Sequence, residues 1–224
     1  MIEYLSEFLD RYADLLIWGT VDTLIAVTVS TFFAYIIGIA LAVVLKITAP
    51  GSLKPQPVIN AIVGWIVNMG RSIPFIILMV LLIKLSRLIV GTSLGVRGSL
   101  VPLTIGAAPF IARLVVSSFE EIPPGRIEAA LAFGASTTQI IWKVYLRESL
   151  PSLVRGAAIA LITLISYQAI MGAFGGGGLG DLAIRYGYHR FKGDVMVAAI
   201  VILIIMVQVI QSVADLVARR IDKR

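Results

Sequence analysis

An acidic residue, two alanines and a glycine stand at a fixed spacing in a polar stretch of the chain. The stretch reads Glu128-Ala129-Ala130, three further residues, Gly134 and then Ala135. Small alanine side chains let a second protein approach closely, and the glutamate offers a charge that orients it. Helices that dock in a groove are a recurring mode of recognition. These five residues are therefore the candidate surface for coupling to a partner.

The residues around this surface predict a short helix, a turn and a second helix. Pro124 suits the first turn of a helix, where its missing N–H costs nothing. Gly134 suits the left-handed position that ends a helix. Ser136 and Gln139 form a capping box, which starts a second helix at about Thr137. Short capped helices transmit motion that a flexible loop would absorb. An interfacial helix pair with no partner is the structural alternative.

This pattern resembles the cytoplasmic coupling signature of ABC-importer permeases, in which Glu-Ala-Ala, three residues and Gly are followed after nine residues by Ile-x-Leu-Pro. Val144 and Leu146 hold the Ile and Leu places, whereas Arg147 stands in place of the Pro. The departure affects only how the second helix ends, and Pro151 can set that boundary instead. The resemblance implies that the coupling surface contacts a cytosolic ATPase.

Three further stretches are similar to the methionine-importer permeases, and the similarity covers about residues 18–218. They are Arg71-Ser72-Ile73-Pro74-Phe75, the segment 101–113 and Gly177-Gly178-Leu179-Gly180. The resemblance implies a type I ABC-importer permease fold with a cytoplasmic coupling helix, in a multi-pass protein of the bacterial cytoplasmic (inner) membrane. It also implies a homodimer, two cytosolic ABC ATPase subunits and an extracytoplasmic substrate-binding lipoprotein. ATP and Mg would be bound by the ATPase, and no cofactor by this chain.

Six residues are candidates for the translocation path or its gate. Arg71 lies inside an apolar segment, where a charge costs roughly 2.5–3.5 kcal/mol on insertion scales. Either it borders the substrate path, or it satisfies carbonyl groups that Pro74 leaves free. The other five occur together: Ser166, Tyr167, Gln168, Ile170 and Met171. In the family this region borders the central path, where apolar side chains can form a dry gate. Core packing is the alternative.

The composition is that of an integral membrane protein. Of the 224 residues 58% are hydrophobic and 14% are charged, against about 45–50% and 25% in soluble domains. The chain has no cysteine and one histidine, His189, so we expect no metal site. A formal net charge of +6 fits Lys and Arg that anchor a cytoplasmic face in the lipid bilayer, and we expect no nucleic-acid partner.

We expect an all-α fold with five transmembrane helices, because a span needs roughly 20 mostly apolar residues. The expected parts are an amphipathic N-terminal segment 1–18, a single permease domain 19–220 and a basic cytoplasmic tail 221–224. Within the permease domain we expect a coupling loop at about 120–151 and five spans, at about 23–45, 58–83, 100–119, 156–174 and 195–214. With the N-terminus outside, and with Arg71 and Arg113 left out because they fall within expected spans, Lys and Arg number ten inside and seven outside, which agrees with this orientation. The N-terminal segment either lies on the outer membrane surface or extends the first span.

The run Gly175–Gly180 invites comparison with a phosphate-binding loop. No Lys-Ser or Lys-Thr pair follows it, and no strand and helix are expected to flank it, so we reject that interpretation. We expect a flexible turn at the outer end of the fourth span, where small residues permit close approach. The charged outer residues behind it are candidates to dock the binding protein or are simply solvated: Asp181, Arg185, Arg190, Lys192 and Asp194.

Three classes of function remain to be compared. The first is the permease subunit of an ATP-driven importer, most simply for methionine and otherwise for another amino acid or small polar nutrient, working by alternating access. The second is an ion-coupled carrier, but the spans lack Asp and Glu and do not divide into repeated halves. The third is an intramembrane enzyme, for which the spans carry almost no catalytic groups. We therefore expect no enzymatic activity in this chain alone.

Overall fold

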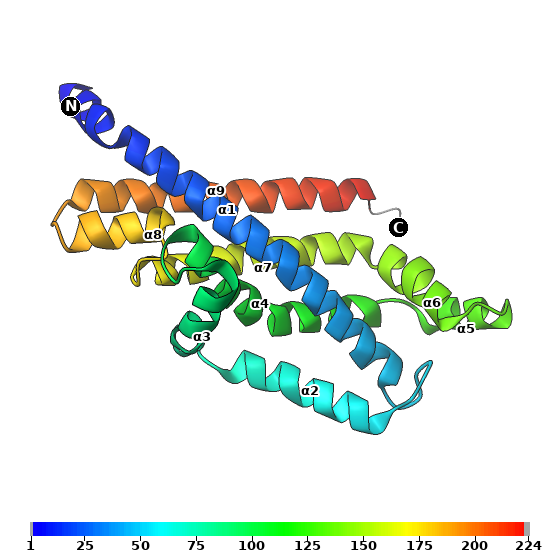
Figure 1. The fold of residues 1–224 in the computed structure, drawn as a ribbon. Coiled ribbons are helices and arrows are strands. Elements are labelled where there is room, and N and C mark those ends of the chain that lie inside the picture. The colour runs from blue at the N-terminus through cyan, green and yellow to red at the C-terminus, as the bar shows by residue number, and fades with distance from the viewer. Residues whose placement is uncertain (1, 222–224) are drawn as a thin grey trace. The chain divides into compact units, whose positions relative to one another are not determined.

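The computed structural model describes residues 2–221, and the side chains from Ser6 onward. Every element in this part of the chain is helical (Figure 1). The elements are α1 (Ile2–Thr48), α2 (Pro57–Ser72), α3 (Phe75–Val90), α4 (Gly95–Glu120), α5 (Pro124–Ala132), α6 (Thr137–Ile140), the π-helix η1 (Ile141–Leu146), α7 (Leu150–Gly172), α8 (Gly178–Leu182), the π-helix η2 (Ala183–Tyr188) and α9 (Gly193–Ile221). Of the basic tail expected at 221–224, residues 222–224 lie outside the described part.

Four of the described helices are long and apolar enough to cross a membrane: α1, α4, α7 and α9. Helices α2 and α3 pass the same test only as a pair that is bent at a short break. Counting this pair as one span gives five, the number expected from the sequence. In α1, α7 and α9 less than half of the most apolar stretch is buried, as in spans that contact lipid, whereas in α4 the buried share is 56%.

The expected second span is divided at Ile73 and Pro74. Proline disfavours helical geometry in the residue before it, and Ile73 accordingly has an extended backbone with φ −80° and ψ 122°. Pro74 is extended as well, with φ −57° and ψ 133°. Two 16-residue helices, α2 and α3, therefore occupy the stretch in which we expected one interrupted helix.

The N-terminal segment is continuous with the first span, since α1 runs unbroken over 47 residues. Leu16 on this helix belongs to a cluster of buried apolar residues with Leu179, Leu182, Ala199 and Met206. The neighbouring side chains of Phe8, Tyr12 and Leu15 pack against the same cluster. The apolar face of the segment is thus covered by α8 and α9 of its own chain.

The chain divides into two compact units, and α1, α4, α7 and α9 each contribute to both. The first unit holds the chain up to Phe32, Pro74–Ile105 and Leu161–Ile210. The second holds Phe33–Ile73, Gly106–Ala160 and the chain from Gln211 on. Within the second unit the Asn60 amide donates to the Leu45 carbonyl at 2.8 Å, which links α2 to α1 as expected of a polar side chain between membrane helices.

Candidate functional site

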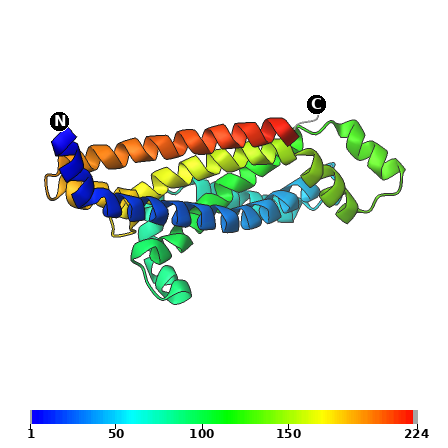
Figure 2. The same cartoon turned by 90° about the horizontal axis from the view of Figure 1, so that it is seen from above.

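The coupling surface predicted from the sequence lies on an elbow, which we define as α5, the turn through Gly134, and α6. Pro124 is the first residue of α5, and Gly134 has a φ of +74°. The Ser136 side chain accepts from the Gln139 N–H, the Gln139 side chain accepts from the Ser136 N–H, and α6 begins at Thr137. The predicted helix, the turn through Gly134 and the capped helix are confirmed. Figure 2 shows the two helices as short coiled segments in the green part of the chain.

No residue of α5 is buried. Glu128, Ala129 and Gly134 are exposed, while Ala130 and Ala135 are half-buried. Phe133, which the motif does not contain, has a side chain that is 92% exposed. An aromatic residue this exposed next to the predicted coupling residues extends their surface, since aromatic side chains are enriched in protein–protein contacts. The signal for it in the sequence was a phenylalanine inside an otherwise small and polar loop.

A hollow of about 540 Å³ lies behind α5 in the second unit. Ile127, Glu128 and Leu131 of α5 line it on one side. Pro124, the first residue of α5, also lines it. The remaining lining comes from the ends of α1 and α4, the loops after them, and η1: Lys46, Ala49, Pro50, Gly51, Ser52, Leu53, Glu120, Ile122 and Tyr145. Helix α5 therefore faces open space where a packed helix would have a core.

Tyr145 anchors η1 beside this hollow. The centres of the Tyr145 and Phe119 rings are 5.2 Å apart, and Lys46 Nζ is 6.0 Å from the centre of the Tyr145 ring. Burial raises the pKa of the Tyr145 phenol above its ordinary value, so the group stays neutral at physiological pH. The packed side of the site is thus η1, and the unpacked side is α5.

Arg71 lies in the last turn of α2, directly before the break at Ile73. Its side chain is exposed, and a positive charge at the C-terminal end of a helix is favourable because the carbonyl groups there point outward. One of these carbonyl groups, that of Asn68, accepts a hydrogen bond from the Ser72 hydroxyl at 2.9 Å. This placement is compatible with both interpretations of Arg71, because an exposed side chain can border a path or remain at the helix end.

The five candidate residues on α7 divide between two faces of the helix. Ser166 and Ile170, one turn apart, are exposed. Gln168 is 0% exposed and Met171 is 3% exposed, so in this chain they point into the protein. Ser166 also lines a groove of about 310 Å³ whose other residues come from α7 and α9: Ile165, Ala169, Leu203, Ile204, Val207 and Gln208.

Tyr167 is half-buried and stacks on Phe75, the first residue of α3. The two ring centres are 4.2 Å apart, and the ring planes differ by 6°. This stack connects the predicted gate segment to the helix that follows the Pro74 break. Phe75 belongs to a motif that the sequence shows, but its contact with Tyr167 could not be predicted, because no local pattern relates two residues so far apart along the chain.

The run Gly175–Gly180, which we call the glycine turn, is not the flexible turn that we expected. Gly176, Gly178 and Gly180 are buried, and α8 begins at Gly178. The Gln168 amide donates to the Gly176 and Gly177 carbonyl groups at 3.0 and 3.2 Å. Hydrogen bonds from the run's own unit hold the backbone, and the helices that approach the glycines closely are α1, α4 and α7.

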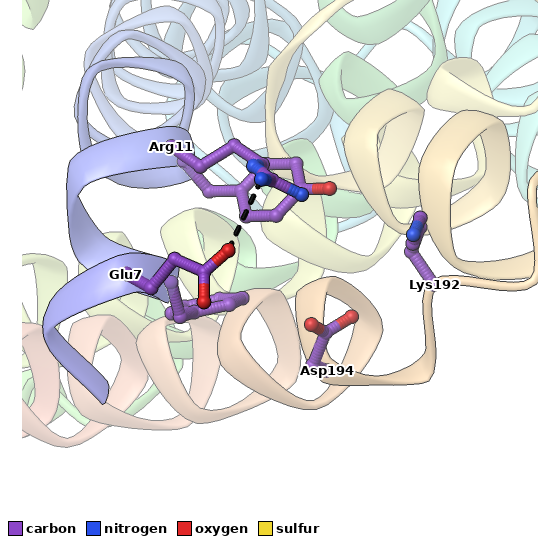
Figure 3. Close-up of a pocket in the computed structure, with 6 residues that line it drawn as sticks. Glu7, Arg11, Lys192 and Asp194 are labelled. Atoms are coloured by element: carbon purple, nitrogen blue, oxygen red, sulfur yellow. Dashed lines mark hydrogen bonds and ion pairs between the residues drawn. The ribbon is translucent and has the colours of Figure 1, made fainter. Parts of the chain in front are cut away.

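The charged residues behind the glycine turn mostly contact their own chain. Arg185 pairs with Asp181 at 2.7 Å, and the Arg190 guanidinium lies 4.5 Å from the centre of the Tyr186 ring. A small hollow of about 180 Å³ lies beside them, between the start of α1 and the start of α9 (Figure 3). It is lined by Glu7, Phe8, Arg11, Tyr12, Lys192 and Asp194.

Within that small hollow the charges are mixed. Arg11 pairs with Glu7 at 3.2 Å along one face of α1, and Asp194 accepts from the Val195 N–H at 2.9 Å. Figure 3 places Lys192 and Asp194 opposite this pair. The described residues contain no group of three or more His, Asp or Glu side chains that could hold a metal ion.

Comparison with known proteins matches residues 34–224 to the family described as "binding-protein-dependent transport system inner membrane component". The Vibrio cholerae probable D-methionine transport system permease protein MetI is 47% identical over 212 residues, which cover 95% of this chain and 94% of that protein. The Bacillus subtilis methionine import system permease protein MetP is 45% identical over 180 residues, which cover 80% of this chain and 81% of that protein.

Solved structures agree with the fold. A chain of the MetNI methionine ABC transporter in an inward-facing conformation has a TM-score of 0.93 and 46% identity, covering 95% of this chain and 99% of that chain. A chain of an amino acid ABC transporter crystallised with histidines has a TM-score of 0.77 at 17% identity, covering 95% of this chain and 96% of that chain. The second match supports the fold alone.

Proposed function

Because this chain belongs to the family of binding-protein-dependent transport system inner membrane components, we propose that it is the permease subunit of an ATP-driven methionine importer in the bacterial inner membrane. The observation that carries the proposal is the similarity, over nearly the whole chain, to permeases of methionine transporters. The elbow supports it independently, since a capped and exposed helix pair is suited to receive motion from a second protein.

The proposed assembly is a homodimer of this chain with two cytosolic ABC ATPases and an extracytoplasmic substrate-binding lipoprotein. This chain carries no Gly-x4-Gly-Lys-Ser/Thr sequence, which is the loop that holds nucleotide phosphates in such motors. ATP and Mg are therefore assigned to the ATPase, and this chain supplies the path through the bilayer. Closure of the ATPase pair would draw the elbows together and open the permease outward.

The proposed joint with the ATPase is formed by Glu128, Ala129, Ala130, Gly134 and Ala135, and Phe133 adds apolar area to it. Its exposed position supports this role. We expect Glu128→Lys to weaken co-purification of the ATPase by at least about tenfold, because residues near the centre of an interface dominate its affinity. Lys143→Glu on η1 is the control for a charge change at an exposed residue nearby. Wild-type affinity in Glu128→Lys would contradict the assignment.

In the proposed path Ser166 and Ile170, on the exposed face of α7, and Tyr167 border the substrate, and Arg71 is a separate candidate to border the path. Gln168 and Met171 would support this face from behind, because both are buried in the single chain. A path of this kind needs few polar groups when specificity is supplied by the binding protein. Arg71→Ala should then abolish uptake while assembly stays intact, whereas a purely structural arginine would affect both.

The test of the function is uptake of labelled methionine in a strain that carries only this transporter, with and without ATP depletion. We expect ATP-dependent uptake that unlabelled methionine competes away and other amino acids do not. Competition by a different amino acid would show that methionine is not the substrate, but the assignment as an ATP-driven importer would still hold. Uptake that survives ATP depletion, in a chain that never co-purifies with an ATPase, would favour an ion-coupled carrier and refute the proposal.

A further inference from the structure

The direction of α5 is not set by packing. None of its residues is buried, and Ile127, Glu128 and Leu131 face the hollow of about 540 Å³. In most helices an apolar face packed on the core fixes the axis. A helix with open space behind it can move into that space when a partner pushes on it, and the push would then be lost.

An ion pair connects the start of α5 to the segment just before α7. The Arg126 guanidinium contacts the Glu148 carboxylate, and the two side chains are 47% and 36% exposed. Arg126 is the third residue of α5, and its own N–H donates to the Pro123 carbonyl at 3.0 Å, so its backbone is held at the helix start. Glu148 precedes the first residue of α7, Leu150, by two positions.

A second polar link reaches the first turn of α7 from the end of α4. The Ser152 hydroxyl donates to the Glu121 carboxylate at 3.0 Å and is 2.9 Å from the Ser118 hydroxyl. The beginning of α7 is therefore held by polar contacts on both sides of the α4–α5 connection. The candidate path residues Ser166 to Met171 lie further along the same helix.

We propose that Arg126 and Glu148 form a strut that transmits the motion of α5 directly into α7 and keeps α5 from moving into the hollow behind it. The proposal rests on the proposed function, since it assigns a direction to the force that the ATPase delivers at the elbow. Exposed ion pairs contribute little to folding. The strut can therefore be removed without unfolding the chain, and its loss should appear as wasted ATP hydrolysis.

The test is a charge swap in the assembled transporter, reconstituted in liposomes with its ATPase and binding protein. ATP hydrolysed per labelled methionine imported is the measured quantity. We expect Arg126→Glu and Glu148→Arg each to raise this ratio by about two- to fivefold, the range expected from an exposed ion pair. The double variant, which restores the pair in reverse, should return close to the wild-type ratio. Lys143→Glu, a matched charge reversal on η1, should leave the ratio unchanged.

Neutral variants keep the proposal testable if a reversed charge prevents assembly. Arg126→Gln, Glu148→Gln and their combination should all raise the ratio equally, because either single substitution already abolishes the ion pair and the second removes no further interaction. The strut would be overturned if the single variants kept the wild-type ratio or if the two increases added in the double neutral variant. It would also be overturned if the charge-swapped double variant had a ratio as high as that of either single charge reversal. A wild-type complex without ATP-dependent methionine uptake would instead refute the proposed function.

Discussion

The elbow and the glycine turn each contain a glycine with a positive φ, in opposite surroundings. Gly134 in the elbow has a φ of +74°, and Gly178 in the glycine turn has a φ of +77°. A Cβ added at Gly134 would meet no atom within 4 Å, whereas one at Gly178 would lie 2.5 Å from the Thr23 hydroxyl oxygen. At the elbow glycine serves only the conformation of the turn, while in the glycine turn it also makes room for neighbouring helices.

This difference separates a surface for a partner from a part of the core. The glycine turn forms hydrogen bonds within its own unit: Ser99 donates to the Gly176 carbonyl at 2.9 Å, and the Leu179 N–H of the turn donates to the Thr23 hydroxyl at 2.9 Å. The elbow has its caps but no buried residue in α5. A glycine-rich sequence therefore does not by itself indicate flexibility or docking. Whether such a run is exposed or buried depends on the helices that pack against it.

The largest effect is expected in the glycine turn, for Gly180→Ala. The added Cβ would lie 2.5 Å from the Ala169 Cα atom, and backbone cannot rotate away as a side chain can. We expect the free energy of unfolding to fall by at least about 3 kcal/mol, the upper end of the cost of overpacking. Thermal unfolding in detergent measures it. A variant as stable as the wild type would show that the glycine turn is loosely packed and would break the contrast with the elbow.

A smaller loss is expected when the amide that holds the glycine turn is removed. Gln168→Ala removes the donor to the Gly177 carbonyl and leaves the Gly176 carbonyl with Ser99 as its donor, and a buried polar group that loses its partner costs about 1–3 kcal/mol. The melting temperature should fall, whereas Ser166→Ala on the exposed face of α7 should leave it unchanged. If Gln168→Ala kept its stability and lost only uptake, Gln168 would belong to the path and not to the core.

The smallest effect on stability is expected at the elbow, for Gly134→Ala. Space is available, so the cost is that of a left-handed backbone with a side chain, roughly 1–2 kcal/mol, and it is confined to the turn. We expect the melting temperature to fall less than in the other two variants, and methionine uptake to be reduced. Gly125→Ala is the control, because its Cβ also meets nothing within 4 Å but its φ is not in the left-handed range. Equal loss of uptake in both variants would contradict the role of the turn geometry.

The sequence was a reliable guide to elements that depend on neighbours along the chain. The capping box of Ser136 and Gln139, the start of α5 at Pro124 and the left-handed Gly134 are all confirmed. Each is an interaction between residues no more than a few positions apart. The proline at position 74 also indicated a disturbance of the second span, although the sequence did not show that it would separate two helices.

The sequence was a poor guide to contacts between distant residues. It did not pair Tyr167 with Phe75 or Arg126 with Glu148, and it placed a flexible turn where the chain is buried. Within α7 it grouped residues 166–171 as one candidate gate, whereas burial divides them between two faces. Which face of an almost wholly apolar helix is covered cannot be read from its pattern, because every side of it is hydrophobic.

Composition and local spacing alone determined that this chain is helical, spans a membrane and carries a capped elbow, because hydrophobicity, caps and proline act over a few residues. Only the tertiary structure decided that the glycine turn is buried, that α5 stands over a hollow and that an arginine in α5 reaches the start of α7. Those features depend on which helices become neighbours, and that choice is made by packing between segments far apart in the sequence, as in the bond from Leu179 to Thr23, which are 156 residues apart.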